Sequence, residues 1–136
     1  MLWSYEARHL DERQLLANLN PAQPVIVTDQ NERIVAVNRN WETMCKYTAE
    51  EAFGSTPGAL LRGALTSREV ATDFSLRVRG GQSAFASLLN YKKDGTMFVN
   101  HIFGYTLGDL LVAETYAEHG FEGDMKASGT VFYLGA

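Results

Sequence analysis

The sequence predicts an α+β domain: a five-stranded antiparallel sheet with helices on one face, plus a flanking N-terminal helix. The first support is the order of patterns, which runs from a helical stripe through two short strand-like runs and helical segments to three further strand-like runs. Strands and helices segregated in this way are typical of α+β domains. The second is residues 83–106, where two strand-like runs surround Lys93-Asp94-Gly95, a turn signal that predicts a β-hairpin. The chain has 136 residues, enough for one domain with its own core.

Residues 1–20 are predicted to form the flanking amphipathic helix, and residues 21–136 the domain itself. The helix is indicated by three leucines whose spacing gives one apolar face: Leu15, Leu16 and Leu19. Asn20-Pro21 should end this helix, because proline disfavours helical geometry in the residue before it.

The first half of the domain is predicted to hold two strands and then short helices. The strands are expected over residues 24–28 and 33–38, and a short helix over residues 40–46. Thr48 begins the sequence Thr-Ala-Glu-Glu, a capping-box signature in which the threonine hydroxyl and the Glu51 carboxylate cap each other's backbone amides. Pro57-Gly58 marks the next stretch as a loop.

The second half is predicted to hold one longer helix and three strands. The helix is capped by Thr66 or Ser67, runs to about Val78 and ends at Gly80-Gly81. The hairpin follows, and residues 130–134 form a last strand. Residues 107–128 fit a short helix or irregular insertion, with a prolonged strand as the alternative.

Two asparagines of the hairpin are the candidate site residues. Because side chains alternate between the faces of a strand, Asn90 shares a face with Ala86 and Leu88, and Asn100 shares one with Phe98 and Ile102. A buried amide among apolar neighbours needs a hydrogen-bond partner. The pattern therefore indicates either a local polar network or a bound ligand with polar edges.

The opposite face of the hairpin is also apolar and must be covered. It carries Phe85, Leu89, Tyr91, Val99, Phe103 and Tyr105. The N-terminal helix is the candidate cover, from the same chain or from a second copy. We expect a homodimer through this helix and the outer sheet face, since two-fold pairs are the commonest oligomers; the alternative is a monomer with intrachain packing.

Composition and charge exclude several classes of function. The net charge of −4 gives no basic surface for nucleic acid, and no apolar run is long enough to span a membrane. Cys45 is the only cysteine, which indicates a reducing, cytoplasmic setting. We expect it to pack as a small buried hydrophobic residue. The three histidines, His9, His101 and His119, are scattered, which predicts no metal site. No nucleophile–base constellation is apparent, so we expect no enzyme.

Two segments of the chain resemble a PAS domain, specifically its LOV (light, oxygen, voltage) branch. Residues 36–51, AVNRNWETMCKYTAEE, are similar to a segment that PAS domains share. Residues 89–96, LNYKKDGT, with Phe98 and Asn100, nearly match the LOV hairpin. The resemblance implies the PAS fold and places Asn90 and Asn100 on the edge of a flavin ring.

The chain departs from the LOV pattern where the flavin chemistry is carried. Gly58 falls at the cysteine that bonds to the flavin, so no cysteinyl adduct can form. Ala59 and Ser75 fall at the two phosphate-binding arginines, and Arg62 at a flavin-contacting glutamine. Residues 132–136 resemble the last strand, which then stops where another flavin-facing glutamine would come.

These residues together predict a non-catalytic sensory module of signal transduction that acts in ligand sensing and dimerisation. The expected cofactor is none or a non-covalent small ligand, with FMN or riboflavin as candidates. A protein partner or a fused effector would receive the output. The alternative is a cysteine-less, flavin-binding photoreceptor or redox sensor.

Overall fold

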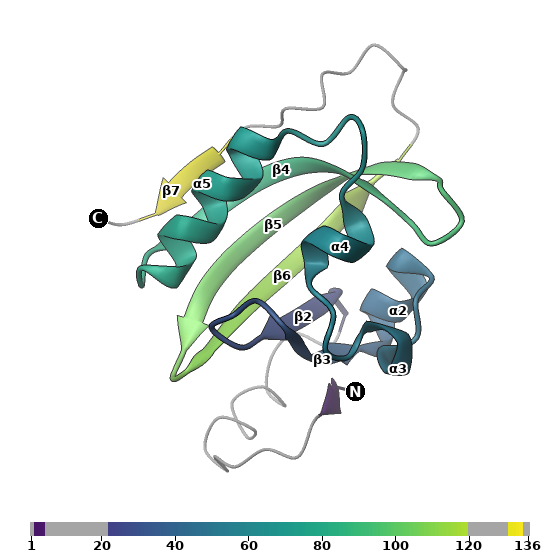
Figure 1. Cartoon of the computed structure of the whole chain (residues 1–136), viewed down its shortest axis with the longest axis horizontal. Helices are drawn as coiled ribbons and strands as arrows, with labels where there is room; N and C mark the ends of the chain where they lie inside the picture. Colours follow the sequence, from purple (N-terminus) through teal and green to yellow (C-terminus); the bar gives the residue numbers. More distant parts are fainter. Residues whose placement is uncertain (1, 5–21, 120–130, 135–136) are drawn as a thin grey trace.

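A computed structural model describes residues 2–4, 22–119 and 131–134 of the chain (Figure 1). In chain order the elements are β1 (Leu2–Ser4), β2 (Val25–Thr28), β3 (Ile34–Asn38), α2 (Arg39–Cys45), α3 (Ala49–Ala52), α4 (Pro57–Leu61), α5 (Arg68–Arg79), β4 (Ser83–Tyr91), β5 (Met97–Leu107), β6 (Leu110–Glu118) and β7 (Val131–Leu134).

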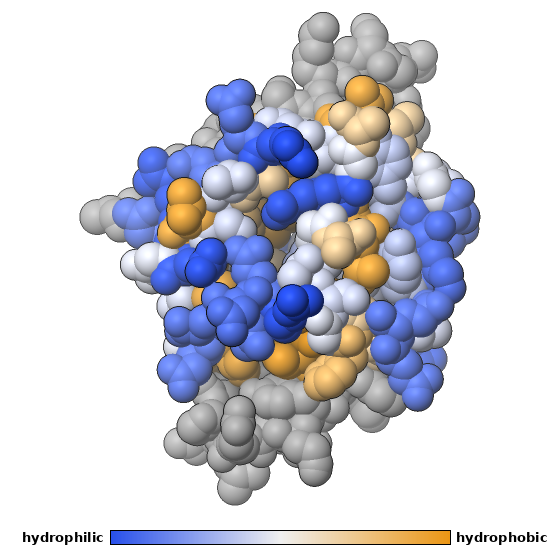
Figure 2. All heavy atoms as spheres, viewed as in Figure 1, coloured by the Kyte–Doolittle hydropathy of each residue, from blue (hydrophilic) through white to orange (hydrophobic). Residues whose placement is uncertain are grey.

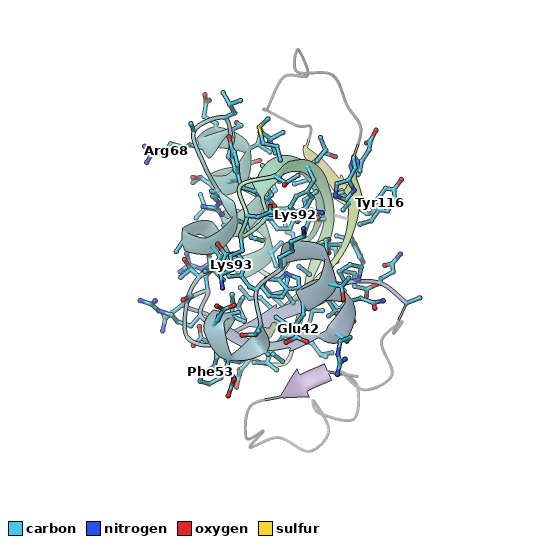
Figure 3. All side chains as sticks on the ribbon, turned by 90° about the vertical axis from the view of Figure 1, so that its right-hand side faces the viewer. Glu42, Phe53, Arg68, Lys92, Lys93 and Tyr116 are labelled. Atoms are coloured by element: carbon cyan, nitrogen blue, oxygen red, sulfur yellow. The ribbon has the colours of Figure 1, made fainter. Side chains whose placement is uncertain are left out.

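The described strands form one antiparallel sheet in the order β1-β3-β2-β6-β5-β4-β7. The four described helices lie on one face of it (Figures 1 and 3). This confirms the predicted α+β class. The five central strands, β3-β2-β6-β5-β4, correspond to the expected sheet, and β1 and β7 extend it at its two edges.

The fifth central strand, β6, is where the sequence prediction was wrong. Residues 107–128 were expected to be a short helix or insertion, yet Leu110–Glu118 is a strand between β5 and β2. Leu107 pairs with Leu110, so Gly108-Asp109 is a two-residue hairpin turn. Gly108 has φ 60, a left-handed conformation that suits glycine in such a turn.

The predicted last strand exists, but at a different place in the sheet. β7 covers Val131–Leu134 and pairs with β4 at the edge of the sheet. It is therefore not one of the five central strands. The last of these in chain order is β6.

Each described helix begins at a side chain that accepts a hydrogen bond from a first-turn amide. The caps are Asn38, Thr48, Thr56 and Ser67. Thr48 and Glu51 form the predicted capping box, with contacts of 3.1 and 2.9 Å. The loop predicted at Pro57-Gly58 is instead helix α4, because Thr56 caps it and proline is favoured in the first helical turn.

The main core lies between the helices and the inner face of the sheet, and a second buried cluster lies on its outer face, formed by Val25, Val27, Ala36, Leu110 and Val112. The largest side chains of the main core are Trp41 of α2 and Phe98 of β5, both fully buried. On α5, Val70 and Phe74 pack against the sheet, whereas Leu76 is 61% exposed. Among the described residues, no helix is long and apolar enough to cross a membrane.

Of the predicted flanking segment, residues 1–20, only Leu2–Ser4 is described. These residues form β1, which pairs with β3 at the edge of the sheet. The leucine stripe of the predicted helix lies outside the described residues, and that helix stays a prediction.

Candidate ligand-binding cavity

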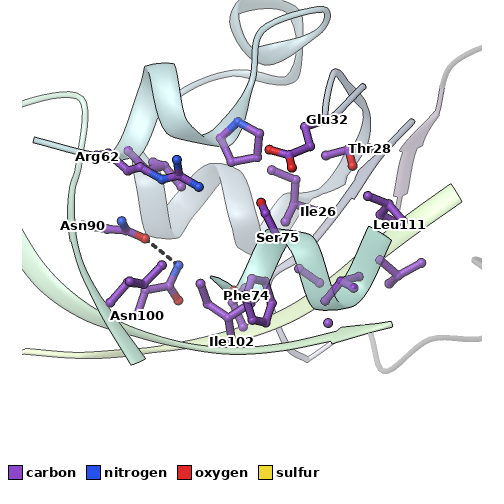
Figure 4. Close-up of a pocket in the computed structure, with 18 of the residues that line it drawn as sticks. Ile26, Thr28, Glu32, Arg62, Phe74, Ser75, Asn90, Asn100, Ile102 and Leu111 are labelled. Carbon is purple, nitrogen blue, oxygen red and sulfur yellow. Dashed lines mark hydrogen bonds between the residues drawn. The ribbon is translucent and has the colours of Figure 1, made fainter. Parts of the chain in front are cut away.

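A mostly apolar cavity of about 100 Å³ lies between α4, α5 and the inner face of the sheet (Figure 4). The inner faces of four strands contribute to it, and Phe74 and Val78 of α5 close it from the other side. In the space-filling view, polar and charged residues surround a hollow between α4 and α5 (Figure 2). We call this space the inner cavity.

The two predicted site residues meet at the inner cavity. Both side chains are buried, and Asn100 Nδ2 donates to Asn90 Oδ1 at 3.0 Å. Asn90 Nδ2 in turn donates to the Leu89 carbonyl at 3.1 Å, which fixes the orientation of the first amide and hence of the second. Part of the predicted local network therefore exists.

That network is incomplete at one atom. Asn100 Oδ1 has no hydrogen-bond partner, although its side chain is only 2% exposed and lines the inner cavity. An unpartnered buried acceptor costs about 1–3 kcal/mol. The indole Nε1 of Trp41, which also lines the cavity, is a buried donor without a partner. The inner cavity thus offers one acceptor and one donor that a polar ligand could satisfy.

Arg62, at the C-terminal end of α4, folds back over Gly58. A Cβ atom at Gly58 would lie 3.0 Å from Arg62 Nη1, tighter than an ordinary van der Waals contact. The guanidinium group therefore takes space that a side chain at position 58 would need. Figure 4 shows Arg62 above Asn90 on one side of the inner cavity, which it lines.

Arg62 also lines a second, polar cavity of about 630 Å³ beside the first. We call it the outer cavity. Its other lining residues are Gly58, Gly63, Thr66, Arg68 and Thr72. The two cavities therefore meet at one cationic side chain.

Glu32, Thr28 and Ser75 lie on the far side of the inner cavity from Asn90 (Figure 4). The Glu32 carboxylate is 3.8 Å from the guanidinium of Arg79, at the end of α5. Arg77 pairs with Asp73 and also contacts Gln82. Neither of these two arginines lines the inner cavity. Neither therefore replaces the phosphate-binding arginine of the LOV pattern at whose position Ser75 falls.

β6 supplies the inner-face positions where the resemblance implies a glutamine. Leu111, Ala113 and Thr115 line the cavity from this strand, and none is a glutamine. The Thr115 hydroxyl donates to the Pro24 carbonyl at 3.1 Å, so it is already partnered. The prediction that this position lies beyond Ala136 was wrong, because the last strand was misplaced.

Cys45 is fully buried in α2, as predicted for a small hydrophobe. It is not among the residues that line the inner cavity. Burial raises the pKa of its thiol from the ordinary 9.0 to about 12, which keeps it in the unreactive thiol form.

The outer face of the sheet holds a polar chain that sequence reasoning missed. Ser87 Oγ lies 2.7 Å from His101 Nδ1, and His101 Nε2 lies 2.8 Å from Glu118 Oε1. The three residues come from β4, β5 and β6, and β6 was not predicted, so the pattern could not be found. Both described cavities are lined by other residues. Among the described residues, no group of three His, Cys, Asp or Glu could hold a metal ion.

Comparisons with known proteins agree with this geometry. A family model described as a PAS domain matches residues 22–113. A blue-light photoreceptor of Listeria innocua is 36% identical over 81 residues, which are 57% of this chain and 32% of that protein. A blue-light photoreceptor of Listeria monocytogenes is 35% identical over the same length. The chain therefore spans about a third of the length of these curated relatives.

Solved structures show the same fold. The light-state structure of the blue-light photoreceptor Aureochrome1 LOV has a TM-score of 0.66 at 25% identity, and covers 72% of this chain and 84% of that one. The Rhodobacter sphaeroides LOV protein has a TM-score of 0.70 at 18% identity, and covers 86% of this chain and 70% of that one. At that identity the second match shows the fold alone.

Proposed function

Because the chain belongs to the PAS domain family, in its LOV-like branch, we propose that it is a non-catalytic sensor of signal transduction that binds a small planar ligand without a covalent bond. The observation that carries this proposal is Asn100 Oδ1, a buried acceptor that lines a cavity and has no partner. A ligand N–H group at this position would remove the cost of the unpartnered oxygen. Gly58 supplies no thiol, so the ligand would be held by polar and apolar contacts alone.

A flavin is the second candidate, and it is favoured by the relatives named blue-light photoreceptors. Asn90 and Asn100 fit the polar edge of its ring, which would supply light absorption and electron transfer when bound. Ala59 and Ser75 supply no cation for a phosphate. The inner cavity of about 100 Å³ is also small against the roughly 300–1,000 Å³ of pockets for drug-sized ligands. A tricyclic ring would therefore require side chains such as Phe74 or Arg62 to move.

The test is to identify what the protein carries when it is purified from cells. We expect an absorption spectrum and mass spectrometry of the heat-released fraction to show one small aromatic ligand near stoichiometry. Asn90→Leu and Asn100→Leu should lower its amount at least about tenfold, since each removes a polar contact at the cavity. Asn31→Ala, in the exposed turn between β2 and β3, is the matched control.

Each result has a clear meaning. Yellow protein that absorbs blue light would select the flavin candidate. A ligand that stays bound at full occupancy in both leucine variants would contradict the assigned site. Protein that carries no ligand, and that gains none from an extract of its host cells, would contradict ligand sensing.

Dimerisation is the second part of the proposed role, and the aromatic outer face supports it. The rings of Phe85 and Phe103 lie 4.8 Å apart, and Phe85 remains 38% exposed. Tyr116 is 59% exposed on the side of the sheet away from the helices (Figure 3). Exposed apolar faces of this kind mark contact surfaces. The N-terminal helix would take part, and a protein partner or fused effector in the cytoplasm would receive the signal.

Light scattering at tens of micromolar tests this part. We expect a dimer that Phe85→Lys converts to a monomer. Phe53→Lys is the control, because Phe53 is similarly exposed, at 52%, but lies on the helix side of the molecule (Figure 3). Leu15→Glu with Leu19→Glu should also weaken association if the predicted helix contributes. A wild-type monomer at these concentrations would contradict dimerisation and leave ligand binding untouched.

A further inference from the structure

The outer face of the sheet is open only along a strip on β4, β5 and β6. Outer-face side chains on either side of it are no more than 6% exposed, among them Val25, Val112, Leu89 and Val99. The open or half-open side chains between them form what we call the outer strip: Phe85, Ser87, His101, Phe103, Glu114, Tyr116 and Glu118. This strip is the part of the sheet that a partner can reach.

The outer strip is acidic. β4, β5 and β6 contain no lysine or arginine but two glutamates, Glu114 and Glu118. The Tyr105 hydroxyl donates to Glu114 at 2.7 Å. Burial and this carboxylate raise the pKa of Tyr105, so the phenol stays neutral and Glu114 keeps its full charge. His101 is therefore the one side chain of these three strands that can supply a positive charge.

The titratable groups that face His101 come from β6, because β4 presents Ser87 and the described helices lie on the opposite face (Figure 1). Glu118 bonds to the imidazole, and Glu114 lies one residue pair further along β6. The Tyr116 ring stacks on the imidazole, with 5.2 Å between centroids. An aromatic ring face in this position favours a cation.

The hydrogen bonds of His101 determine which nitrogen carries its proton. An ionised carboxylate only accepts, so Nε2 donates to Glu118 at 2.8 Å. In the neutral ring, Nδ1 then accepts from the Ser87 hydroxyl at 2.7 Å. When Nδ1 takes up a proton it donates to Ser87 Oγ instead, and the hydroxyl hydrogen turns away. Both contacts survive protonation, which changes the charge of the outer strip from two negative charges to one.

That change matters most when the strip meets its own copy. In a two-fold pair the same surface is used on both sides, so the aromatic rings meet rings and the carboxylates meet carboxylates. Repulsion between two identical surfaces grows with the square of their charge, and one proton on each side therefore removes about three quarters of it.

We infer that the outer strip pairs with a second copy of this chain and that protonation of His101 controls the pairing. The dimer forms at mildly acidic pH, where histidine is charged, and loosens at mildly alkaline pH. This inference rests on the dimerisation proposed above and adds its regulation.

Sedimentation of the full chain over a concentration series, at one ionic strength, measures the dimer dissociation constant. We expect it to be at least about tenfold lower near pH 6 than near pH 8. His101→Gln should hold the weak value at both pH values, and His101→Lys the tight one. Glu118→Gln leaves one negative charge on the strip, so at pH 8 it should match the wild type at pH 6. High salt should reduce these differences.

The other two histidines are the matched controls, because acidification lowers the net negative charge at each of them as well. His119→Gln alters an exposed ring that stacks on Phe98 of the inner face, and His9→Gln alters the third histidine of the chain. Both should keep the wild-type response to pH, and circular dichroism checks that every variant is folded.

The outcomes separate the regulation from the dimer itself. A dimer with equal dissociation constants at the two pH values would overturn the inference and leave dimerisation standing. The same holds if His101→Gln keeps the full response to pH, or if a control variant loses it. A wild-type monomer at both pH values would overturn dimerisation and this inference together.

Discussion

Replacing both hairpin asparagines by leucine should stabilise the ligand-free protein. The double change removes the amide pair and with it the unpartnered Asn100 Oδ1. The Leu89 carbonyl loses Asn90 but keeps the Thr66 hydroxyl, which donates to it at 2.6 Å. No new buried polar group is left without a partner by this change. The larger leucine side chains have an adjoining cavity of about 100 Å³ to fill.

The magnitude follows from the groups that are removed and those that are buried. Losing the Asn100–Asn90 and Asn90–Leu89 hydrogen bonds costs about 1 kcal/mol each, and removing the unpartnered oxygen returns about 1–3 kcal/mol. Burying apolar leucine atoms adds about 1 kcal/mol or more. We expect the free energy of unfolding to rise by about 1 kcal/mol, which raises Tm by about 4 °C for a domain of this size.

The single variants should differ in a fixed order. Asn90→Leu leaves both amide atoms of Asn100 without partners, so it should lower stability by about 1–3 kcal/mol. Asn100→Leu removes the unpartnered Asn100 oxygen but leaves the Asn90 oxygen without its donor. The stability of this variant should therefore lie near that of the wild type. Stability should therefore fall from the double variant through Asn100→Leu and the wild type to Asn90→Leu.

Urea unfolding of ligand-free protein, followed by circular dichroism, measures this order. The reasoning fails if the double variant is less stable than the wild type by about 2 kcal/mol or more. That result would mean that the pair stabilises the fold and that Asn100 Oδ1 has a partner in solution, such as a bound water. An unchanged slope of free energy against urea would show that both variants unfold from the same compact state.

Three further predictions concern the cap, the cavity wall and the thiol. Thr48→Ala should lower the free energy of unfolding by about 1 kcal/mol through loss of the capping box, with the exposed Thr43→Ala as control, both measured in urea. Gly104→Ala should cost about 1–3 kcal/mol because its Cβ would lie 2.6 Å from Phe74 Cζ, and Phe74→Leu should restore most of that loss; no rescue would contradict the contact. Because burial raises the pKa of the Cys45 thiol to about 12, its contribution to stability is complete below pH 9.0 and is lost as the pH rises toward 12. At pH 8 the folded protein should react with a thiol reagent only as fast as it unfolds, and rapid labelling of folded protein would refute the burial.

Local signals in the sequence were enough for much of the fold. The Thr48 capping box, a cap of α5 at Thr66 or Ser67 and the hairpin turn at Lys93-Asp94-Gly95 were all predicted, because each depends on residues a few positions apart. Asn90 and Asn100 were placed at one site for the same reason. They lie on the two strands of one hairpin, where Asn90 pairs with Phe98 and Asn100 pairs with Leu88.

The errors arose where the decisive contacts are distant. β6 contains Leu, Ala and Glu, which favour helices, and it becomes a strand because β5 and β2 flank it. Gly108-Asp109 was a usable hairpin signal for it. Thr56-Pro57 likewise indicated the start of α4. The meeting of Arg62 with two cavities could not be predicted, because it depends on how α4 lies against α5 and the sheet.

The central place of β6 has a consequence for how the protein folds. β6 joins the β2–β3 pair to the β4–β5 hairpin, and its Thr115 bonds to Pro24, 91 positions earlier in the chain. During synthesis on the ribosome, these two halves cannot unite until β6 has emerged. Contacts this distant in sequence slow folding, because a long loop must close before they form. We therefore expect a truncation before Leu110 to leave two unjoined hairpins with exposed strand edges, which is a form prone to aggregate.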